Sequence, residues 1–164
     1  DYGANHDYMK EFCAYWVNEF DWRTQERKIN SFTQRKMSIQ GINMHHAQED
    51  GSGPNPMPLM ISHGWPSSVL EFSEIIELLA HPERFGGKVE AFTMIAPSLP
   101  GFGFSGRPDR PYGPRKMASV IRDLMINGLG FDSYLARAAT GVAQYVRSLA
   151  MTMRQSEQQS ISMY

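Results

Sequence analysis

Residues 58–66, Pro-Leu-Met-Ile-Ser-His-Gly-Trp-Pro, decide the fold that this sequence predicts. The apolar run over 59–61 is too short for a helix and lies between prolines, which is typical of a strand covered on both faces. Ser67 and Ser68 can then cap a helix, because apolar residues recur at helical spacing over 69–79. A buried strand is therefore predicted to end in a sharp turn, at the carboxyl-terminal edge where open parallel sheets bind ligands.

Hydrophobic spacing predicts further elements on both sides of this strand. We expect helices over 6–20 and 21–29, two tightly joined strands within 35–48, a strand over 92–97, a helix over 117–128 and a strand over 134–138. Together they predict an α/β fold with a mostly parallel sheet flanked by helices. The expected domains are an N-terminal helical extension over 1–34, an α/β domain over 35–150 and a polar tail over 151–164.

Composition excludes several classes of partner. A net charge of −1 with 20% charged residues gives no electrostatic footprint for nucleic acid or an acidic membrane surface. The apolar runs are far shorter than the roughly 20 residues that a membrane span needs, so no span is expected. The single cysteine, Cys13, excludes an internal disulfide and predicts a reducing, cytoplasmic location. Cys13 lies on the apolar stripe of the first helix, and we interpret it as a core residue.

The turn His63-Gly64-Trp65-Pro66 is followed by two serines and an apolar stretch. Taken alone, such a turn also suits a plain tight turn before a capped helix. It resembles the HGWP turn of epoxide hydrolases, which have the α/β-hydrolase fold. The resemblance implies an oxyanion hole with the backbone N–H of Trp65 among its donors, and a fixed donor needs no reorganisation when charge develops. His63, mostly structural in the family motif, is the nearby titratable residue, so His63 and Trp65 are the predicted catalytic residues.

Two other stretches resemble the same family. Phe20-Asp21-Trp22-Arg23 is similar to the motif of the N-terminal extension in the microsomal-type branch, where the extension wraps around the catalytic domain. This implies a structural role, with Trp22 as a packing anchor. Residues 97–105, Pro-Ser-Leu-Pro-Gly-Phe-Gly-Phe-Ser, resemble a loop that borders the family's active site. Phe102 and Phe104 are then expected in the pocket wall, although core packing is the stronger alternative for Phe104.

No cofactor and no metal are predicted. Gly101, Gly103 and Gly106 satisfy the G-x-G-x-x-G spacing, but helical periodicity resumes only near Pro114, so no helix start is placed to hold a pyrophosphate. The adjacent pair of histidines at 45–46 would face opposite sides of a strand and cannot share a metal.

The resemblance breaks at the nucleophile elbow, the turn that carries an aspartate in the family. Here residues 138–142 read Ala-Ala-Thr-Gly-Val, and no aspartate follows Asp132. Either Thr140 replaces the aspartate or about three elbow residues are lost, and Thr140 is a poor replacement, because a β-branched residue disfavours the strained backbone of an elbow. The family's later strands, lid, second carboxylate and catalytic histidine would lie beyond residue 164. The sequence therefore predicts the front half of an α/β-hydrolase fold, truncated and without covalent epoxide hydrolysis.

Three functional hypotheses stay open. The chain is an enzyme that isomerises or cyclises an apolar molecule, such as an epoxide or polyene, without a covalent intermediate. Alternatively, it is a pseudoenzyme that binds a small molecule without turnover. A third hypothesis is an inactive, truncated hydrolase fragment whose reading frame shifts after about residue 137. The predicted substrate-binding residues are Trp65, Pro66, Phe102 and Thr140.

The strand over 134–138 predicts self-association. In the family's strand order this strand is central, whereas this sequence shows no later strand pattern to pair with its outer side. An unpaired strand edge recruits another chain. We therefore expect a homodimer or tighter oligomer that covers residues 134–138.

Overall fold

The computed structural model describes residues 3–138 and contains two units, Asp1–Ser31 and Phe32–Tyr164. The first unit holds α1 (His6–Asn18) and α2 (Trp22–Ile29), which confirms the two predicted helices. Asp21 caps α2, because its side chain accepts a hydrogen bond from the Thr24 N–H. The domain boundaries predicted at 34 and 150 stay predictions, and the predicted tail lies outside the described residues.

Within the first unit the apolar stripe of α1 is exposed. Phe12 and Trp16 are 47% and 62% exposed, Cys13 is exposed, and Trp22 at the start of α2 is 51% exposed. The interpretation of Cys13 as a core residue is therefore wrong within this unit. Helical spacing identified the stripe correctly, but spacing alone does not supply the surface that covers it.

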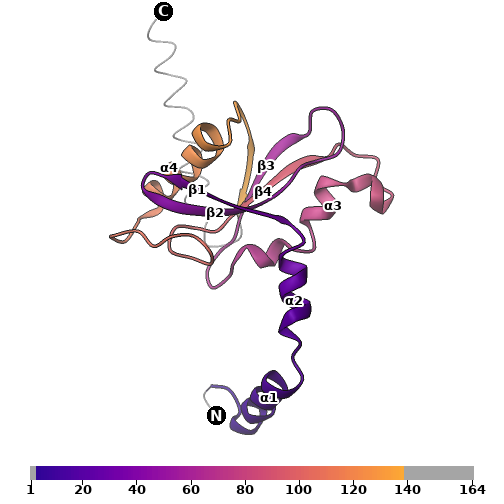
Figure 1. Cartoon of the computed structure of the whole chain (residues 1–164), viewed down its shortest axis with the longest axis vertical. Helices are drawn as coiled ribbons and strands as arrows, with labels where there is room; N and C mark the ends of the chain where they lie inside the picture. Colours follow the sequence, from indigo (N-terminus) through magenta and orange to yellow (C-terminus); the bar gives the residue numbers. More distant parts are fainter. Residues whose placement is uncertain (1–2, 139–164) are drawn as a thin grey trace, which may run out of the picture. The chain divides into compact units, whose positions relative to one another are not determined.

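The second unit is built on a five-stranded sheet in the order β1-β2-β4-β3-β5. Its strands are β1 (Thr33–Ile39), β2 (Ile42–Glu49), β3 (Met57–Ser62), β4 (Phe92–Pro97) and β5 (Leu135–Ala138). The pairs β1–β2 and β2–β4 are antiparallel, whereas β3 runs parallel to both β4 and β5. Figure 1 shows α3 (Ile76–Ala80) and α4 (Pro114–Asp123) on either side of this sheet. The α/β architecture predicted from the sequence is confirmed.

The turn between β1 and β2 is held by long-range contacts. Gln40 and Gly41 both have positive φ, 49° and 80°, and only the glycine adopts such a value without steric cost. The side-chain amide of Gln40 donates to Ser119 Oγ at 2.9 Å, and Lys116 Nζ donates to Gln40 Oε1. These contacts stabilise the strained residue and fix the hairpin against α4 (Pro114–Asp123).

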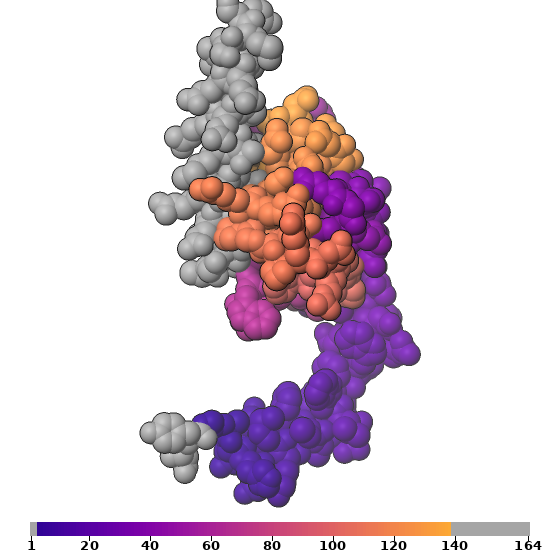
Figure 2. All heavy atoms as spheres, turned by 90° about the vertical axis from the view of Figure 1, so that its left-hand side faces the viewer, coloured from indigo at the N-terminus to yellow at the C-terminus, as the bar shows by residue number. Residues whose placement is uncertain are grey.

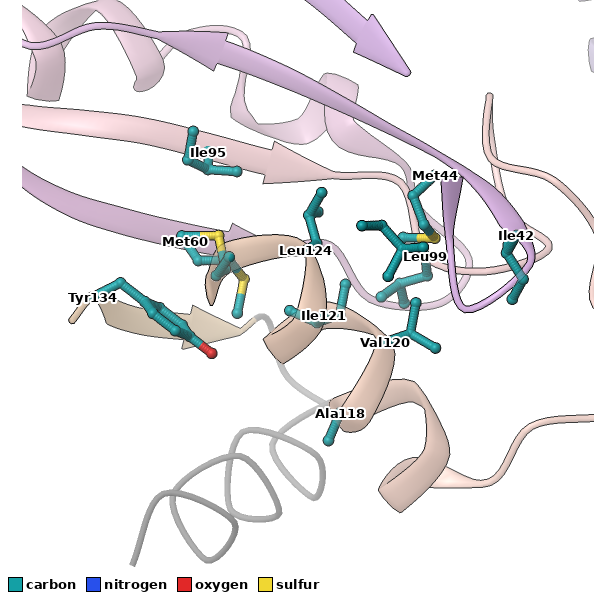
Figure 3. Close-up of a cluster of buried hydrophobic side chains, with 12 residues drawn as sticks. Ile42, Met44, Met60, Ile95, Leu99, Ala118, Val120, Ile121, Leu124 and Tyr134 are labelled. Carbon is teal, nitrogen blue, oxygen red and sulfur yellow. The ribbon is translucent and has the colours of Figure 1, made fainter. Parts of the chain in front are cut away.

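Successive residues of β3 enter two different cores. Met60 packs with Ile121 and Leu124 from α4 and the π-helical turn η3 (Leu124–Gly128), as Figure 3 shows. Ile61 packs on the other face of the sheet, in a cluster that includes Val69 and Ile76. A strand buried on both faces is what the short apolar run predicted, and each such side chain contributes about 1.5–3 kcal/mol.

The single helix predicted over 69–79 is wrong in its form. The segment contains a 3-10 turn, η1 (Val69–Phe72), and a short helix, α3 (Ile76–Ala80). Ser68 caps η1 through a hydrogen bond from the Leu70 N–H, as a capping serine should. Between η1 and α3 the backbone makes hydrogen bonds between residues three apart, such as the one that the Ile75 N–H donates to the Phe72 carbonyl. Both helical forms place residues three or four apart on one face. The periodicity is confirmed for the buried Val69 and Ile76, but Leu70, Ile75 and Leu78 are 40%, 39% and 41% exposed.

The last described strand, β5, is confirmed, although it begins at Leu135 rather than at residue 134. Its partner in the described sheet is β3, with Leu59 opposite Leu135 and Ser62 opposite Ala138. Within residues 3–138 the other side of β5 pairs with no strand.

Candidate functional site

His63 follows directly after the last residue of β3 and is fully buried. Its Nδ1 lies 3.0 Å from the Gly64 carbonyl, and its Nε2 accepts a hydrogen bond from the Leu99 N–H at 3.1 Å. Because a carbonyl only accepts, Nδ1 carries the proton and the ring is the neutral tautomer. Both ring nitrogens are thus engaged in tying the turn after β3 to the loop after β4.

Aromatic rings place Trp65 beside this anchor. The Phe102 ring contacts His63 edge-on at 5.9 Å between centroids and Trp65 edge-on at 6.2 Å. Trp65 is nevertheless 80% exposed, and Pro66, joined to it by a cis peptide bond, is also exposed. An exposed indole that is held by a half-buried ring presents an apolar face to solvent, which is the property of a ligand contact.

The loop after β4 is fixed by a buried polar network. His45 Nδ1 lies 2.9 Å from Ser98 Oγ, and His45 Nε2 lies 2.6 Å from Gln34 Oε1. Ser105 accepts from the His45 N–H and donates to the Ser98 carbonyl at 2.7 Å. Burial, followed by the positive charges of His46 and Lys36, lowers the pKa of His45 to about 4. A neutral His45 therefore holds the loop that carries Phe102.

A cavity of about 330 Å³ adjoins Phe102. Its apolar wall includes Tyr112 and Met117, and its polar rim includes Arg107, Asp109 and Arg110. In Figure 2 the orange segment that follows β4 spreads over one face of the second unit. The lining mixes apolar rings with charged groups, so it suits a largely apolar molecule with a polar end.

The structure brings three of the five predicted site residues into ring contact. His63, Phe102 and Trp65 are in ring contact, and Pro66 is adjacent in sequence, whereas Thr140 lies outside the described residues. Phe104 is half-exposed and contacts His45 edge-on at 5.0 Å, so it is not a core residue. The roles predicted for His63 and Trp65 stay predictions. Among residues 3–138 the N–H of Trp65 donates no backbone hydrogen bond.

Three other expectations can be compared with the described chain. Residues 3–138 contain no group of three or more side chains placed to hold a metal ion. The glycine-rich loop does not open a helix, because α4 begins only at Pro114. None of the described helices has the length and apolar character of a membrane span.

Sequence reasoning missed the polar network around Ser98. Gln34, His45 and Ser98 lie on three different segments, and the last two are 53 residues apart. Two neighbouring histidines in a strand were a signal that one of them enters a polar site. His46, the other, is fully buried, and its ring nitrogens have no hydrogen-bond partner among the described residues.

Comparison with known proteins gives consistent results. Residues 1–72 match the family described as Epoxide hydrolase N terminus. Epoxide hydrolase 1 of Oryctolagus cuniculus is 36% identical over 160 residues, which cover 90% of this chain and 35% of that protein. Juvenile hormone epoxide hydrolase of Manduca sexta is 32% identical over 154 residues, covering 92% and 33% of the two chains.

Solved structures support the same assignment. Juvenile hormone epoxide hydrolase from the silkworm Bombyx mori superposes with a TM-score of 0.80 at 29% identity, over 91% of this chain and 35% of that one. The chain spans about a third of the length of the curated relatives it matches. The turn after β3, the sheet order and these likenesses agree, and the chain belongs to the epoxide hydrolase family, with an α/β-hydrolase fold.

Proposed function

We propose that the corner formed by Trp65 and Phe102 binds an apolar small molecule with an oxygen acceptor, such as an epoxide, and that this chain does not hydrolyse it covalently. The observation that carries the proposal is the exposed Trp65 indole in edge-on contact with Phe102, a residue that also lines a cavity of about 330 Å³. The names of the relatives, which are epoxide hydrolases, support an epoxide as the ligand class.

Binding without hydrolysis is supported by the state of His63. A general base must have a free nitrogen within reach of the proton that it removes. Both nitrogens of His63 are engaged, one with the Gly64 carbonyl and one with the Leu99 N–H. The sequence at 138–142 also has no aspartate where the family carries its nucleophile. A ligand oxygen would therefore meet a hydrogen-bond donor at Trp65 but no attacking carboxylate from that stretch.

One observation favours a catalytic form of this proposal, in which the chain isomerises or cyclises its ligand. The Trp65 N–H makes no backbone hydrogen bond within residues 3–138, so it is available to an oxygen on which negative charge develops. Such a donor accelerates a rearrangement that needs positioning and charge stabilisation alone.

Binding and turnover of styrene oxide and a terpenoid epoxide separate these forms. We expect titration calorimetry to show binding that Trp65→Ala weakens at least about tenfold, because the indole face is lost. Trp22→Ala, on α2, is the matched control and should leave the affinity unchanged. Chromatography of the products detects isomerisation or cyclisation, and its absence leaves the pseudoenzyme form. Diol that carries oxygen from labelled water would overturn the loss of hydrolysis, and absence of binding would favour an inactive fragment.

We also infer that β5 pairs with a second copy of the chain. Its outer side has no partner strand within residues 3–138, and an open edge supports association. A homodimer should give twice the chain mass in multi-angle light scattering. The single Cys13 supports a reducing, cytoplasmic location, which cell fractionation tests.

A further inference from the structure

A second polar cluster lies at the opposite end of the sheet from Trp65. Glu49 is the last residue of β2, Ser52 lies in the loop before β3, and His81 follows α3. Since β3 has six residues, its length of about 17 Å separates this cluster from the turn that begins at His63. Nothing in the proposed function uses these side chains.

The three side chains form a continuous hydrogen-bonded chain. Ser52 Oγ lies 2.6 Å from His81 Nδ1, and His81 Nε2 donates to Glu49 Oε1 at 2.8 Å. The His81 side chain is 9% exposed, and that of Glu49 is 27% exposed. A hydroxyl, an imidazole and a carboxylate in this order are the parts of an activated serine.

We propose that Ser52 is a nucleophile for small carboxylic esters, with His81 as its general base and Glu49 as the positioning residue for His81. Glu49 accepts the Nε2 proton, so Nδ1 is the ring nitrogen that faces Ser52 Oγ and can take the hydroxyl proton, which Ser52 donates to Glu83 Oε1 in this structure. The same roles recur in unrelated folds, so geometry rather than position in the chain defines them.

The reaction balances with water as the second substrate. Ser52 Oγ attacks the carbonyl carbon of the ester while its proton passes to His81 Nδ1. The bond to the leaving oxygen breaks, and that oxygen takes the proton from His81. Water then attacks the acylated serine with His81 again as base, which releases the carboxylic acid and restores the hydroxyl.

The loop that carries Ser52 is held in place beside a cavity of about 550 Å³. The Ser52 N–H donates to the Ala80 carbonyl at 2.9 Å, and the Gly51 N–H donates to Thr93 Oγ1 at 3.3 Å. Ser52 itself lines the cavity. The apolar part of the lining consists of Pro54, Pro56, Val89 and Ala91. A nucleophile that is fixed at the wall of an accessible cavity meets the requirement for positioning.

Two glutamates define the class of ester. Glu83 Oε1 lies 2.7 Å from Ser52 Oγ, and Glu90 lines the same cavity. The hydrogen bond from Ser52 lowers the pKa of the Glu83 carboxyl, so its charge is present at neutral pH. Glu83 competes with His81 for the hydroxyl proton and repels a negative oxygen. The cavity therefore favours neutral or cationic esters over anionic ones.

The test uses the full chain with p-nitrophenyl acetate, acetylcholine and the anionic p-nitrophenyl succinate. We expect hydrolysis of the first two, and a fluorophosphonate should label Ser52 in the digested protein. Ser52→Ala should abolish both signals, whereas Ser133→Ala, in an exposed loop, should change neither. Glu49→Gln should lower kcat at least about tenfold with KM unchanged, because it alters the base and not the cavity.

Glu83→Gln provides the most discriminating result. Removal of this charge should raise kcat severalfold, since the hydroxyl proton is then left to His81 and the oxyanion is no longer repelled. A purely structural hydrogen-bond cluster predicts no gain. Trp65→Ala should leave ester hydrolysis intact, which separates this site from the proposed ligand corner. The proposal is overturned if Ser52→Ala retains the hydrolysis rate or if the label attaches elsewhere.

Discussion

His45 is buried between the Ser98 hydroxyl and the Gln34 amide, and burial lowers its pKa to about 4 from an ordinary value of 6.5. Between these two values the unfolded chain binds more protons than the folded chain. The free energy of unfolding therefore rises with pH through this window and falls as pH drops from 6.5 to 4. The shift corresponds to at most about 3 kcal/mol, fully present above pH 6.5.

The titration of His45 leads to the first testable prediction. His45→Gln keeps a polar side chain but removes the titration, so we expect its stability to vary less between pH 7 and pH 4.5 than that of the parent chain. Urea unfolding followed by circular dichroism at both pH values measures this difference. Parallel losses of stability in the two proteins would show that His45 does not set the acid response.

His63 and Trp65 are two residues apart but should differ in what they stabilise. His63→Ala leaves the buried Leu99 N–H without its acceptor and opens a cavity, so we expect a loss of about 2–4 kcal/mol in unfolding free energy. Trp65→Ala removes an 80% exposed side chain and should cost less than about 1 kcal/mol. Urea titration of both variants tests the contrast, and equal losses would contradict it.

The sequence predicted where the turn at His63 lies but not how His63 is used. The strand, the glycine and the proline are local signals, whereas the acceptor role of His63 Nε2 depends on Leu99, 36 residues away. The cluster of Ser52, His81 and Glu49 gave no local signal for the same reason, since loops and strand ends bring its members together. Side-chain chemistry of this kind depends on tertiary contacts that periodicity does not contain.

At the scale of elements, the junction between the loop before β3 and β4 depends on one glycine. A Cβ on Gly51 would lie 2.6 Å from the backbone carbonyl of Phe92, which cannot move without displacing β4. We expect Gly51→Ala to cost at least about 2 kcal/mol of unfolding free energy. Gly113, which precedes α4, has open space around its Cβ position, so Gly113→Ala should cost less than about 1 kcal/mol. Thermal unfolding of both variants distinguishes a steric effect from a general effect of losing glycine.

The bounds of helices and strands were predicted most accurately where a single sequence signal dominated. β4 (Phe92–Pro97) has the predicted bounds because a short apolar run between polar segments admits few alternatives. The stretch over 69–79 is divided into η1 and α3, and its expected apolar stripe is buried at Val69 and Ile76 but exposed at Leu70, Ile75 and Leu78. Spacing of three or four residues is shared by both helical forms, so it determines the buried side and not the pitch.

At the scale of the whole molecule, the last prediction concerns the unpaired side of β5. In a dimer formed through this edge, the outward amides of Leu135–Ala138 donate to a partner strand. We expect all of these amides to exchange slowly with deuterium at high protein concentration. Dilution below the dissociation constant should leave alternate amides unprotected, because the N–H groups of a strand point to opposite sides in turn.

The molecular mass in solution and the deuterium exchange of the β5 amides must change together for this prediction to hold. Light scattering at the same concentrations should show the mass falling from twice the chain mass to the chain mass as protection is lost. Protected amides at every concentration in a monomer would place another part of the same chain on the edge of β5. Exposed amides in a dimer would place the interface elsewhere, so either combination contradicts pairing through β5.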